Sequence, residues 1–227
     1  MSADFTAVYP LKRGRAHEVC GPGATYFAAS CCNLSPKPSM WILPDWSHEA
    51  LNPVGLAQYC DPTRILLAKA KTQVDLLAAA EEALRSGAMG LVICEIYEPL
   101  SLTHGRRLQL AAEAGRTTGL IVMPEGMGSN AAETRWHCTP LAGTTAPGQT
   151  APGKTASANA GNPLQSGPEK GLDSTRQRWD IIKNKSGTLA SWVTDWDATS
   201  HRVIVVSKTG ERSRAASAPL GLRADHG

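Results

Sequence analysis

The sequence lacks the long apolar segments of membrane and secreted proteins. No apolar run approaches the ~20 residues that a bilayer-spanning helix needs, and the first residues contain no apolar core typical of a secretion signal. We therefore expect a cytoplasmic protein without membrane contact. A strong surplus of one charge is also missing, because a net charge of +3 over 227 residues is too small to indicate a nucleic-acid-binding face.

Metal-binding patterns are missing as well. The six cysteines include no C-x-x-C pair, and the six histidines are scattered with no pair at the spacing of metal ligands. Cys20 and Cys94 lie in apolar runs typical of strands, so we expect free, buried thiols in a reducing compartment. The six tryptophans could stack on bases, but core and sheet-edge packing is their more common role. We predict neither a metal nor a cofactor.

What the chain does contain is an alternation of apolar strands and amphipathic helices. Thr72 and Asp75 form a capping box before one helix, which Gly87 ends, and Ser101 opens the next. The expected strands are 15–20, 40–43, 64–68, 90–94 and 119–123, the expected helices are 26–32, 72–87 and 101–115, and further strands are expected at 176–183, 190–195 and 201–206. This order predicts an α/β fold with a parallel sheet covered on both faces.

The composition changes at residues 142–171, which are rich in Ala, Gly, Thr, Pro and Ser. A segment with so few apolar groups cannot offset its ordering entropy, so we predict a disordered inserted loop. With 42% hydrophobic residues, the rest suits one core. We expect a single domain from 15–141 and 172–206, preceded by an N-terminal segment (1–14) and followed by a flexible tail (207–227).

One letter-for-letter match to the phosphate-binding motif G-x-x-x-x-G-K-T lies inside this loop, from Gly148 to Thr155. The motif is credible only between a strand and a helix, and neither neighbour is expected here. A near-repeat of Thr-Ala-Pro-Gly explains the spacing of its two glycines. We therefore dismiss this match.

A second segment has the layout of a phosphate-binding loop without its chemical groups. A strand ending at Cys20 is followed by Gly21, Gly23 and Thr25 and then by an apolar helix. Counting from Gly21, the positions of the second Gly, the Lys and the Ser/Thr are occupied by Tyr26, Phe27 and Ala28. The backbone turn is predicted to survive, while the groups that neutralise phosphate and reach a metal are gone.

Several blocks of the chain resemble the RecA-like family, and within it the ImuA proteins of the ImuA, ImuB and error-prone polymerase mutagenesis cassette. The RecA-like blocks are G-x-x-x-E-V-x-G-P at 14–22, ALNP at 50–53, and EEALRSGA at 81–88 leading into LVICE at 91–95. The blocks similar to ImuA are GLAQY at 55–59, EALRSG at 82–87, RRLQLAAE at 106–113, TTGL at 117–120, AETRW at 132–136 and the stretch from Trp192 to Trp196. The resemblance implies a RecA-like three-layer fold, with a central mostly parallel sheet and a C-terminal antiparallel extension.

The resemblance also assigns vestigial roles to four positions. Glu95 takes the place of the aspartate that helps to hold a metal, while His48 stands where the water-positioning carboxylate is expected, with Glu49 one place away. Lys183 matches a turn that reaches the γ-phosphate of a neighbouring subunit, but Lys185 replaces its arginine, and an ammonium cannot form the bidentate fork of a guanidinium.

The resemblance therefore implies a non-catalytic adaptor in damage-induced (SOS) translesion synthesis and mutagenesis. Its partners would be an ImuB-like Y-family protein and, through it, an error-prone C-family polymerase. We expect no ATP hydrolysis. Two alternatives are an ATP-dependent recombinase-like ATPase that uses Glu95 and Lys183, and a SulA-type division inhibitor, another shortened RecA-like protein without the loop. Self-association, contact with RecA and direct DNA binding stay open.

Overall fold

The computed structural model describes residues 4–47, 51–141, 175–185 and 187–209. The predicted loop at 142–171 with its motif match at 148–155 lies outside these residues, as do His48 and Glu49 and nearly all of the predicted tail. The strands and helices expected from the sequence are all present, with ends that differ by about two residues.

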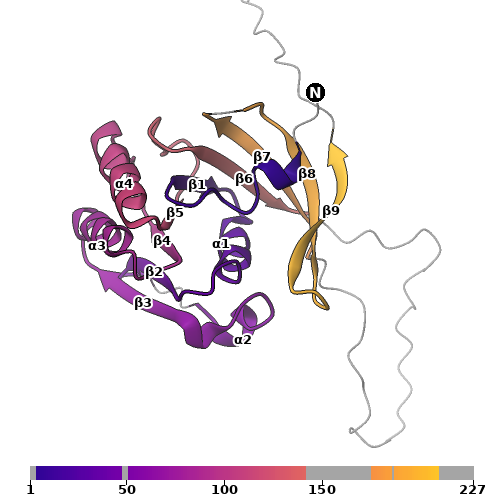
Figure 1. The fold of residues 1–227 in the computed structure, drawn as a ribbon, viewed down its shortest axis with the longest axis horizontal. Helices are drawn as coiled ribbons and strands as arrows, with labels where there is room; N and C mark the ends of the chain where they lie inside the picture. Colours follow the sequence, from indigo (N-terminus) through magenta and orange to yellow (C-terminus); the bar gives the residue numbers. More distant parts are fainter. Residues whose placement is uncertain (1–3, 48–50, 142–174, 186, 210–227) are drawn as a thin grey trace, which may run out of the picture.

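A single sheet forms the centre of the described structure. Its strands are β1 (Ala16–Cys20), β2 (Ser39–Pro44), β3 (Ile65–Ala70), β4 (Leu91–Glu95), β5 (Thr118–Val122), β6 (Thr134–Pro140), β7 (Gln177–Asn184), β8 (Ser191–Asp197) and β9 (Arg202–Thr209). The order across the sheet is β3-β2-β4-β5-β1-β6-β7-β8-β9. The first six strands in this order are parallel, and β7, β8 and β9 continue the sheet antiparallel. Figure 1 shows the sheet curving around α1.

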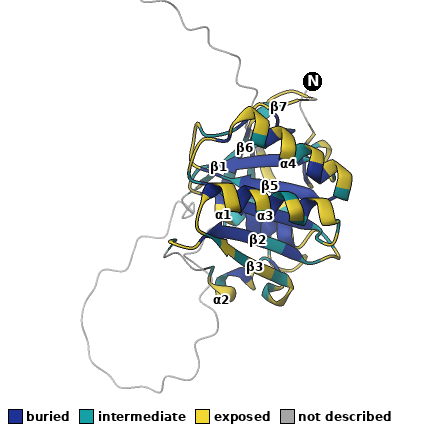
Figure 2. Ribbon diagram, turned by 90° about the vertical axis from the view of Figure 1, so that its left-hand side faces the viewer, coloured by how far each residue is buried: buried dark blue, intermediate teal, exposed yellow. Residues whose placement is uncertain are grey.

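Helices cover both faces of the sheet. α1 (Ala24–Cys32) and the short α2 (Pro53–Leu56) lie on the concave side, and α3 (Gln73–Ser86) and α4 (Leu102–Gly115) pack side by side on the other (Figures 1 and 2). Two 3-10 turns, Phe5–Ala7 and Pro62–Arg64, complete the elements. The predicted fold class, a three-layer α/β fold with a mostly parallel sheet and a C-terminal antiparallel extension, is confirmed.

The ends of α3 and α4 follow from their capping residues. Thr72 Oγ1 accepts a hydrogen bond from the Asp75 N–H at 3.2 Å, and Gly87 adopts a left-handed conformation with φ of 67°. Ser101 Oγ caps α4 by accepting from the His104 N–H at 3.2 Å. The C-terminal cap of α4 is Arg116 with φ of 51°, a conformation that favours glycine.

The core is divided by the sheet into two apolar clusters. The one beneath α3 and α4 consists of aliphatic side chains such as Leu76 and Leu84. The one around α1 is aromatic, and the largest of its fully buried side chains are Trp41, Trp136, Trp179, Trp192 and Phe27. Four of the six tryptophans are therefore core residues as predicted, whereas Trp46 is 55% exposed. All six cysteines are buried and free.

Two parts of this aromatic cluster were not expected from the sequence. Strand β6 alternates buried and partly exposed residues, with Trp136 and Cys138 inward, which is the pattern of a half-buried strand. The N-terminal segment, to which we assigned no structure, places Phe5 and Tyr9 in the core, where the Tyr9 ring lies 5.3 Å from the Trp179 ring. β6 thus forms a wall beside α1.

Candidate functional site

The loop after β1 keeps the order of a phosphate-binding loop. β1 ends at Cys20, Gly21 adopts φ of 88°, and α1 begins at Ala24 with Gly23 as its N-cap. A side chain at Gly21 would be strained at this positive φ, which explains the glycine. The predicted strand, turn and helix are therefore present at this edge of the sheet, where the carboxyl ends of the parallel strands meet.

Neighbouring strands fill the space in front of this loop. The Gly23 N–H donates a hydrogen bond to the Cys138 carbonyl of β6 at 2.9 Å. A Cβ atom built on Gly21 would lie 2.6 Å from the same carbonyl, and one on Gly23 would lie 2.4 Å from Gln177 Oε1. A backbone amide that binds the protein's own carbonyl cannot also hold a phosphate, so this part of the cradle is closed.

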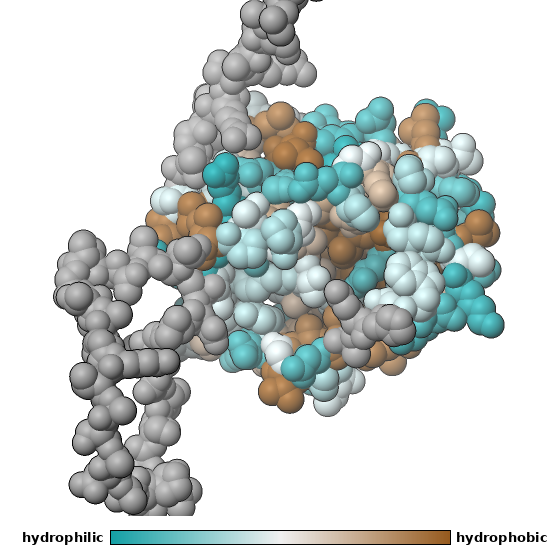
Figure 3. Space-filling model, turned by 180° about the vertical axis from the view of Figure 1, so that it is seen from behind, coloured by the Kyte–Doolittle hydropathy of each residue, from teal (hydrophilic) through white to brown (hydrophobic). Residues whose placement is uncertain are grey.

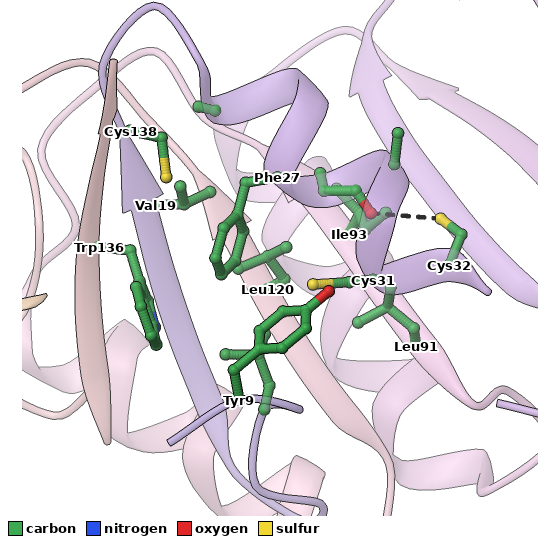
Figure 4. Packing of buried hydrophobic residues seen from close by; sticks show 14 of the residues in the cluster. Tyr9, Val19, Phe27, Cys31, Cys32, Leu91, Ile93, Leu120, Trp136 and Cys138 are labelled. Atoms are coloured by element: carbon green, nitrogen blue, oxygen red, sulfur yellow. Dashed lines mark hydrogen bonds between the residues drawn. The ribbon is translucent and has the colours of Figure 1, made fainter. Parts of the chain in front are cut away.

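Positions 26–28 belong to the aromatic core. Phe27 and Ala28 are fully buried, and the Phe27 ring lies 4.6 Å from Trp179 and 5.3 Å from Trp136. Figure 4 shows Phe27 pointing from α1 toward the sheet, among Val19, Leu120, Trp136 and Tyr9. The position of the loop lysine therefore faces the interior, away from any site at the edge of the sheet.

Tyr26, the neighbour of Phe27, lies at the margin of this core. Its ring packs edge-on against Tyr59 at 4.9 Å. Its hydroxyl is buried without a hydrogen-bond partner among the described residues. Burial, and then the nearby Tyr59, raises the pKa of Tyr26 well above its usual range. The phenol is thus held neutral.

Three of the predicted positions meet in one pocket of about 350 Å³. Thr25 and Tyr26 of α1 face Glu95, the last residue of β4, and residues 51–59 around α2 close the other side. Glu95 Oε1 accepts a hydrogen bond from the buried Trp41 Nε1 at 2.7 Å. Apolar side chains from several elements, among them Leu43, Leu51 and Leu56, provide much of the lining, which suits an apolar group better than a triphosphate.

The two lysines of the predicted turn lie at the opposite edge of the sheet. Lys183 is one of the last residues of β7, which pair with the first residues of β6, and Lys185 follows the end of β7. Lys183 Nζ donates to the Ala132 carbonyl, and Lys185 Nζ donates to the Ala131 carbonyl at 2.6 Å. Burial, and then the charge of Lys185, lowers the pKa of Lys183. In this chain both ammonium groups therefore contact the backbone of their own subunit.

No group of three or more His, Cys, Asp or Glu side chains within the described ranges is placed to hold a metal ion. No described helix is long and apolar enough to cross a membrane. The surface seen from behind carries small apolar groups separated by polar side chains (Figure 3). What the region around Gly23 presents is therefore exposed protein surface and the pocket lined by Thr25, Tyr26 and Glu95.

Comparison with known proteins gives matches among solved structures only. No family model matches the chain, and no curated protein does. Among solved structures, the chain is similar to SulA from Pseudomonas aeruginosa, with 27% identity and a TM-score of 0.40. The alignment covers 47% of this chain and 95% of the SulA chain. A superposition of this quality carries no argument about function.

Polar groups in the middle of the sheet were missed by the sequence analysis. Glu18, only 1% exposed within β1, accepts from Arg135 Nε of β6 and from the Ser129 N–H, both at 2.7 Å. His137 Nε2 lies 2.8 Å from Glu125 Oε1 beside Gly21. The available signal was a carboxylate in the middle of a predicted buried strand, since a buried charge needs a partner.

Proposed function

We propose that this chain is a non-catalytic RecA-like adaptor of the ImuA type, acting in damage-induced translesion DNA synthesis. It contacts an ImuB-like Y-family protein and, through it, an error-prone C-family polymerase. The single observation that carries the proposal is the closed loop, in which the Gly23 N–H binds Cys138 and Phe27 is part of the core. The sequence blocks similar to ImuA supply the pathway.

Nucleotide turnover has little support at this loop. A working loop holds phosphate with backbone amides and a lysine, and each charge-assisted hydrogen bond is worth about 1.5–3 kcal/mol. Here the Gly23 amide is engaged and the lysine position is Phe27, with the neighbouring Ala28 offering no metal ligand. Glu95 alone cannot replace these contacts. We expect no ATP hydrolysis and weak or absent nucleotide binding.

The face beside the former nucleotide site is our candidate for the ImuB contact, because RecA-like subunits associate through this region. Trp46, which follows β2, is 55% exposed and packs edge-on against Tyr97 at 5.1 Å. Val54 of α2 is 75% exposed beside the pocket that contains Glu95. Exposed tryptophan side chains are typical of protein-binding surfaces.

Co-purification from damaged cells tests the proposal. Tagged chain should retain an ImuB-like protein, and the substitution Trp46→Ser should weaken this retention, while Leu110→Ser on the exposed face of α4 serves as the matched control. Failure to co-purify with the tag at either end would contradict the adaptor function. Isothermal titration with Mg-ATP should give no saturable heat, and a micromolar dissociation constant would favour an ATPase.

A SulA-type division inhibitor remains the second candidate, since such a protein also lacks a working loop. Overexpression of the chain distinguishes the two. An adaptor should leave cell length unchanged, whereas filamentous cells together with a failure to retain the ImuB-like protein would favour the inhibitor. The Trp46→Ser variant is carried through the same assay to relate either result to this surface.

A further inference from the structure

The loops that precede the parallel strands carry a set of exposed cations. Arg13 precedes β1, Lys37 precedes β2, Arg64 directly precedes β3, and Arg116 lies just before β5. These four residues, here named the amino-edge cluster, lie at the amino ends of the parallel strands, opposite the closed loop. Since neighbouring strands are about 4.8 Å apart, the cluster extends over roughly 19 Å from β3 to β1.

Three of the four charges of the cluster are held by backbone carbonyl groups. Arg13 Nε donates to the Arg116 carbonyl at 2.7 Å, Lys37 Nζ donates to the Gly87 carbonyl at 2.6 Å, and Arg64 Nη2 donates to the carbonyls of Ser35 and Pro36. A carbonyl fixes the position of a cation without cancelling its charge, and a guanidinium keeps further donors for a ligand.

Two acidic residues lie three positions from a cation of this cluster, Asp61 before Arg64 and Glu113 before Arg116, and both have other partners. Glu113 forms an ion pair with Arg15 at 3.1 Å. The Asp61 carboxylate accepts from the N–H and the hydroxyl of Thr63, at 2.9 and 2.7 Å. The charge of Arg64 also lowers the Asp61 pKa, but by less than the hydrogen bonds to Thr63 do. The cluster therefore keeps its positive potential.

A pocket of about 210 Å³ lies between Arg13 and Lys37. Leu11, Cys31 and Leu91 form its buried floor, and Leu34, which is 42% exposed, forms a wall. None of its lining residues, all of which the structure describes, is acidic or aromatic. The pocket has room for one bulky apolar side chain, with cations on both sides.

We propose that the amino-edge cluster binds an acidic peptide segment of a partner protein, one apolar residue of which enters the pocket between Arg13 and Lys37. Arginine clusters recognise acidic motifs through charge-assisted hydrogen bonds, and a buried apolar anchor adds affinity. The aliphatic lining favours a peptide over nucleic acid, because recognition of unpaired bases depends on aromatic rings for stacking.

This inference deepens the proposed function and rests on it in one respect, namely that the ligand is a protein. It adds a second surface at the far edge of the sheet from Trp46. The peptide site can be tested with purified chain alone, so its outcome does not depend on retention of the ImuB-like protein.

The probe is a short fluorescein-labelled peptide of aspartate and serine with one central phenylalanine, titrated with the full chain at low salt. Replacing Arg13→Gln and Lys37→Gln together should weaken binding about tenfold, since the charged contacts to the peptide are lost. The matched control is Lys69→Gln with Lys71→Gln, two exposed lysines at the other end of β3, which should leave binding unchanged. Thermal unfolding checks that each variant is folded.

The pocket is tested by a double-mutant comparison. Leu34→Ala should weaken binding of the phenylalanine peptide about fivefold and leave binding of the same peptide with alanine unchanged. Equal loss with both peptides would contradict the anchor. A single-stranded oligonucleotide of the same charge should bind more weakly, and tighter oligonucleotide binding that responds to the Arg13 and Lys37 substitutions would overturn the peptide proposal.

Failure of this inference can be told apart from failure of the adaptor function. If folded chain retains the ImuB-like protein but does not bind the probe above the level of the Arg13→Gln, Lys37→Gln variant, the peptide site is wrong and the adaptor stands. If the chain binds the probe with the expected losses but never retains the ImuB-like protein, the peptide site stands and the adaptor function is wrong.

Discussion

At the carboxyl edge of the sheet the loop after β1 binds the protein's own carbonyl, whereas at the amino edge the loops before β1 and β2 hold cations toward solvent. Both edges use backbone carbonyls as partners. At the first edge Cys138 accepts from the Gly23 N–H and removes a group that could bind an anion. At the second edge the carbonyls of Arg116 and Gly87 orient Arg13 and Lys37 and leave their charges available.

The two edges of the sheet therefore differ in the groups that they leave available to an anion. A phosphate-binding loop depends on unfilled space in front of glycines, and here β6 and Gln177 occupy that space. Closure is coupled to core packing, because the helix that follows the loop inserts Phe27 among tryptophans. The amino edge has no such coupling, since its cations are exposed. Its chemistry can therefore change without cost to the core.

The largest effect is expected from reopening the loop with Phe27→Lys. A lysine at this fully buried position places an unpaired charge against Trp136 and Trp179, so the free energy of unfolding should fall by about 4 kcal/mol or more. Urea unfolding measures the loss, and Phe27→Leu, which should cost only about 1 kcal/mol, is the control for volume. A stable Phe27→Lys chain that binds Mg-ATP would show that the two edges differ less than we conclude.

The next effect concerns His17, whose strand β1 runs from one edge to the other. Burial lowers the His17 pKa from 6.5 to about 4, while the hydrogen bond to the Lys12 carbonyl and the charge of Glu133 oppose the shift and the charges of Lys12 and Arg15 support it. Between pH 6.5 and 4, His17 is therefore protonated in the unfolded chain and neutral in the folded chain. The contribution of His17 to stability is complete above pH 6.5 and falls by about 3 kcal/mol as the pH drops to 4.

The pH dependence is measured by urea unfolding at a series of pH values. His17→Gln keeps a donor for the Lys12 carbonyl, which His17 Nε2 contacts at 3.0 Å, but removes the titrating group. The difference between the two chains should change slope only between pH 6.5 and 4. Identical slopes in the wild-type and variant chains would mean that His17 remains solvated.

A smaller effect is expected from Gly23→Ala. The added Cβ would lie 2.4 Å from Gln177 Oε1 and 3.1 Å from the Cys138 carbonyl carbon, and Gln177 cannot move freely because its Oε1 accepts from Trp179 Nε1 at 3.0 Å. We expect a loss of about 2 kcal/mol. Gly55→Ala in α2 is the matched control, since its Cβ would meet only Asn52 Cβ at 3.9 Å. Equal stability of the Gly23→Ala and Gly55→Ala variants would show that the space in front of Gly23 is open.

Local patterns were sufficient to predict most of the fold. Thr72, Gly87 and Ser101 mark helix ends through capping chemistry that depends on a few neighbouring residues, and each has the expected role. Strand β6 was missed because only Trp136 and Cys138 are large apolar residues in it, although polar residues such as Arg135 and His137 alternate with them. Their reason for being there lies in partners outside the strand, the distant Glu18 for Arg135 and the nearer Glu125 for His137.

The candidate site was predictable in composition but not in geometry. The sequence shows that Tyr26, Phe27 and Ala28 replace the phosphate-binding groups. It cannot show that the Gly23 N–H pairs with Cys138, because that contact joins residues more than a hundred positions apart. The amino-edge cluster was invisible for the same reason. Arg13, Lys37, Arg64 and Arg116 are scattered in sequence, and only the parallel sheet brings them to one edge.

The smallest expected effect is that of Glu95→Gln, which asks whether the carboxyl edge keeps any metal chemistry. The amide still offers an oxygen to Trp41 Nε1, now 2.7 Å from Glu95 Oε1, so stability should change by about 0.5 kcal/mol or less. Glu95→Leu removes the acceptor and should cost about 1 kcal/mol, because the buried indole N–H then lacks this partner. If Glu95 served a metal and nucleotide, Glu95→Gln would instead abolish Mg-ATP binding while leaving stability intact. Titration calorimetry and urea unfolding together separate the two roles. If Glu95 is structural, Glu95→Gln changes neither Mg-ATP binding nor stability. If Glu95 is functional, Glu95→Gln changes Mg-ATP binding alone.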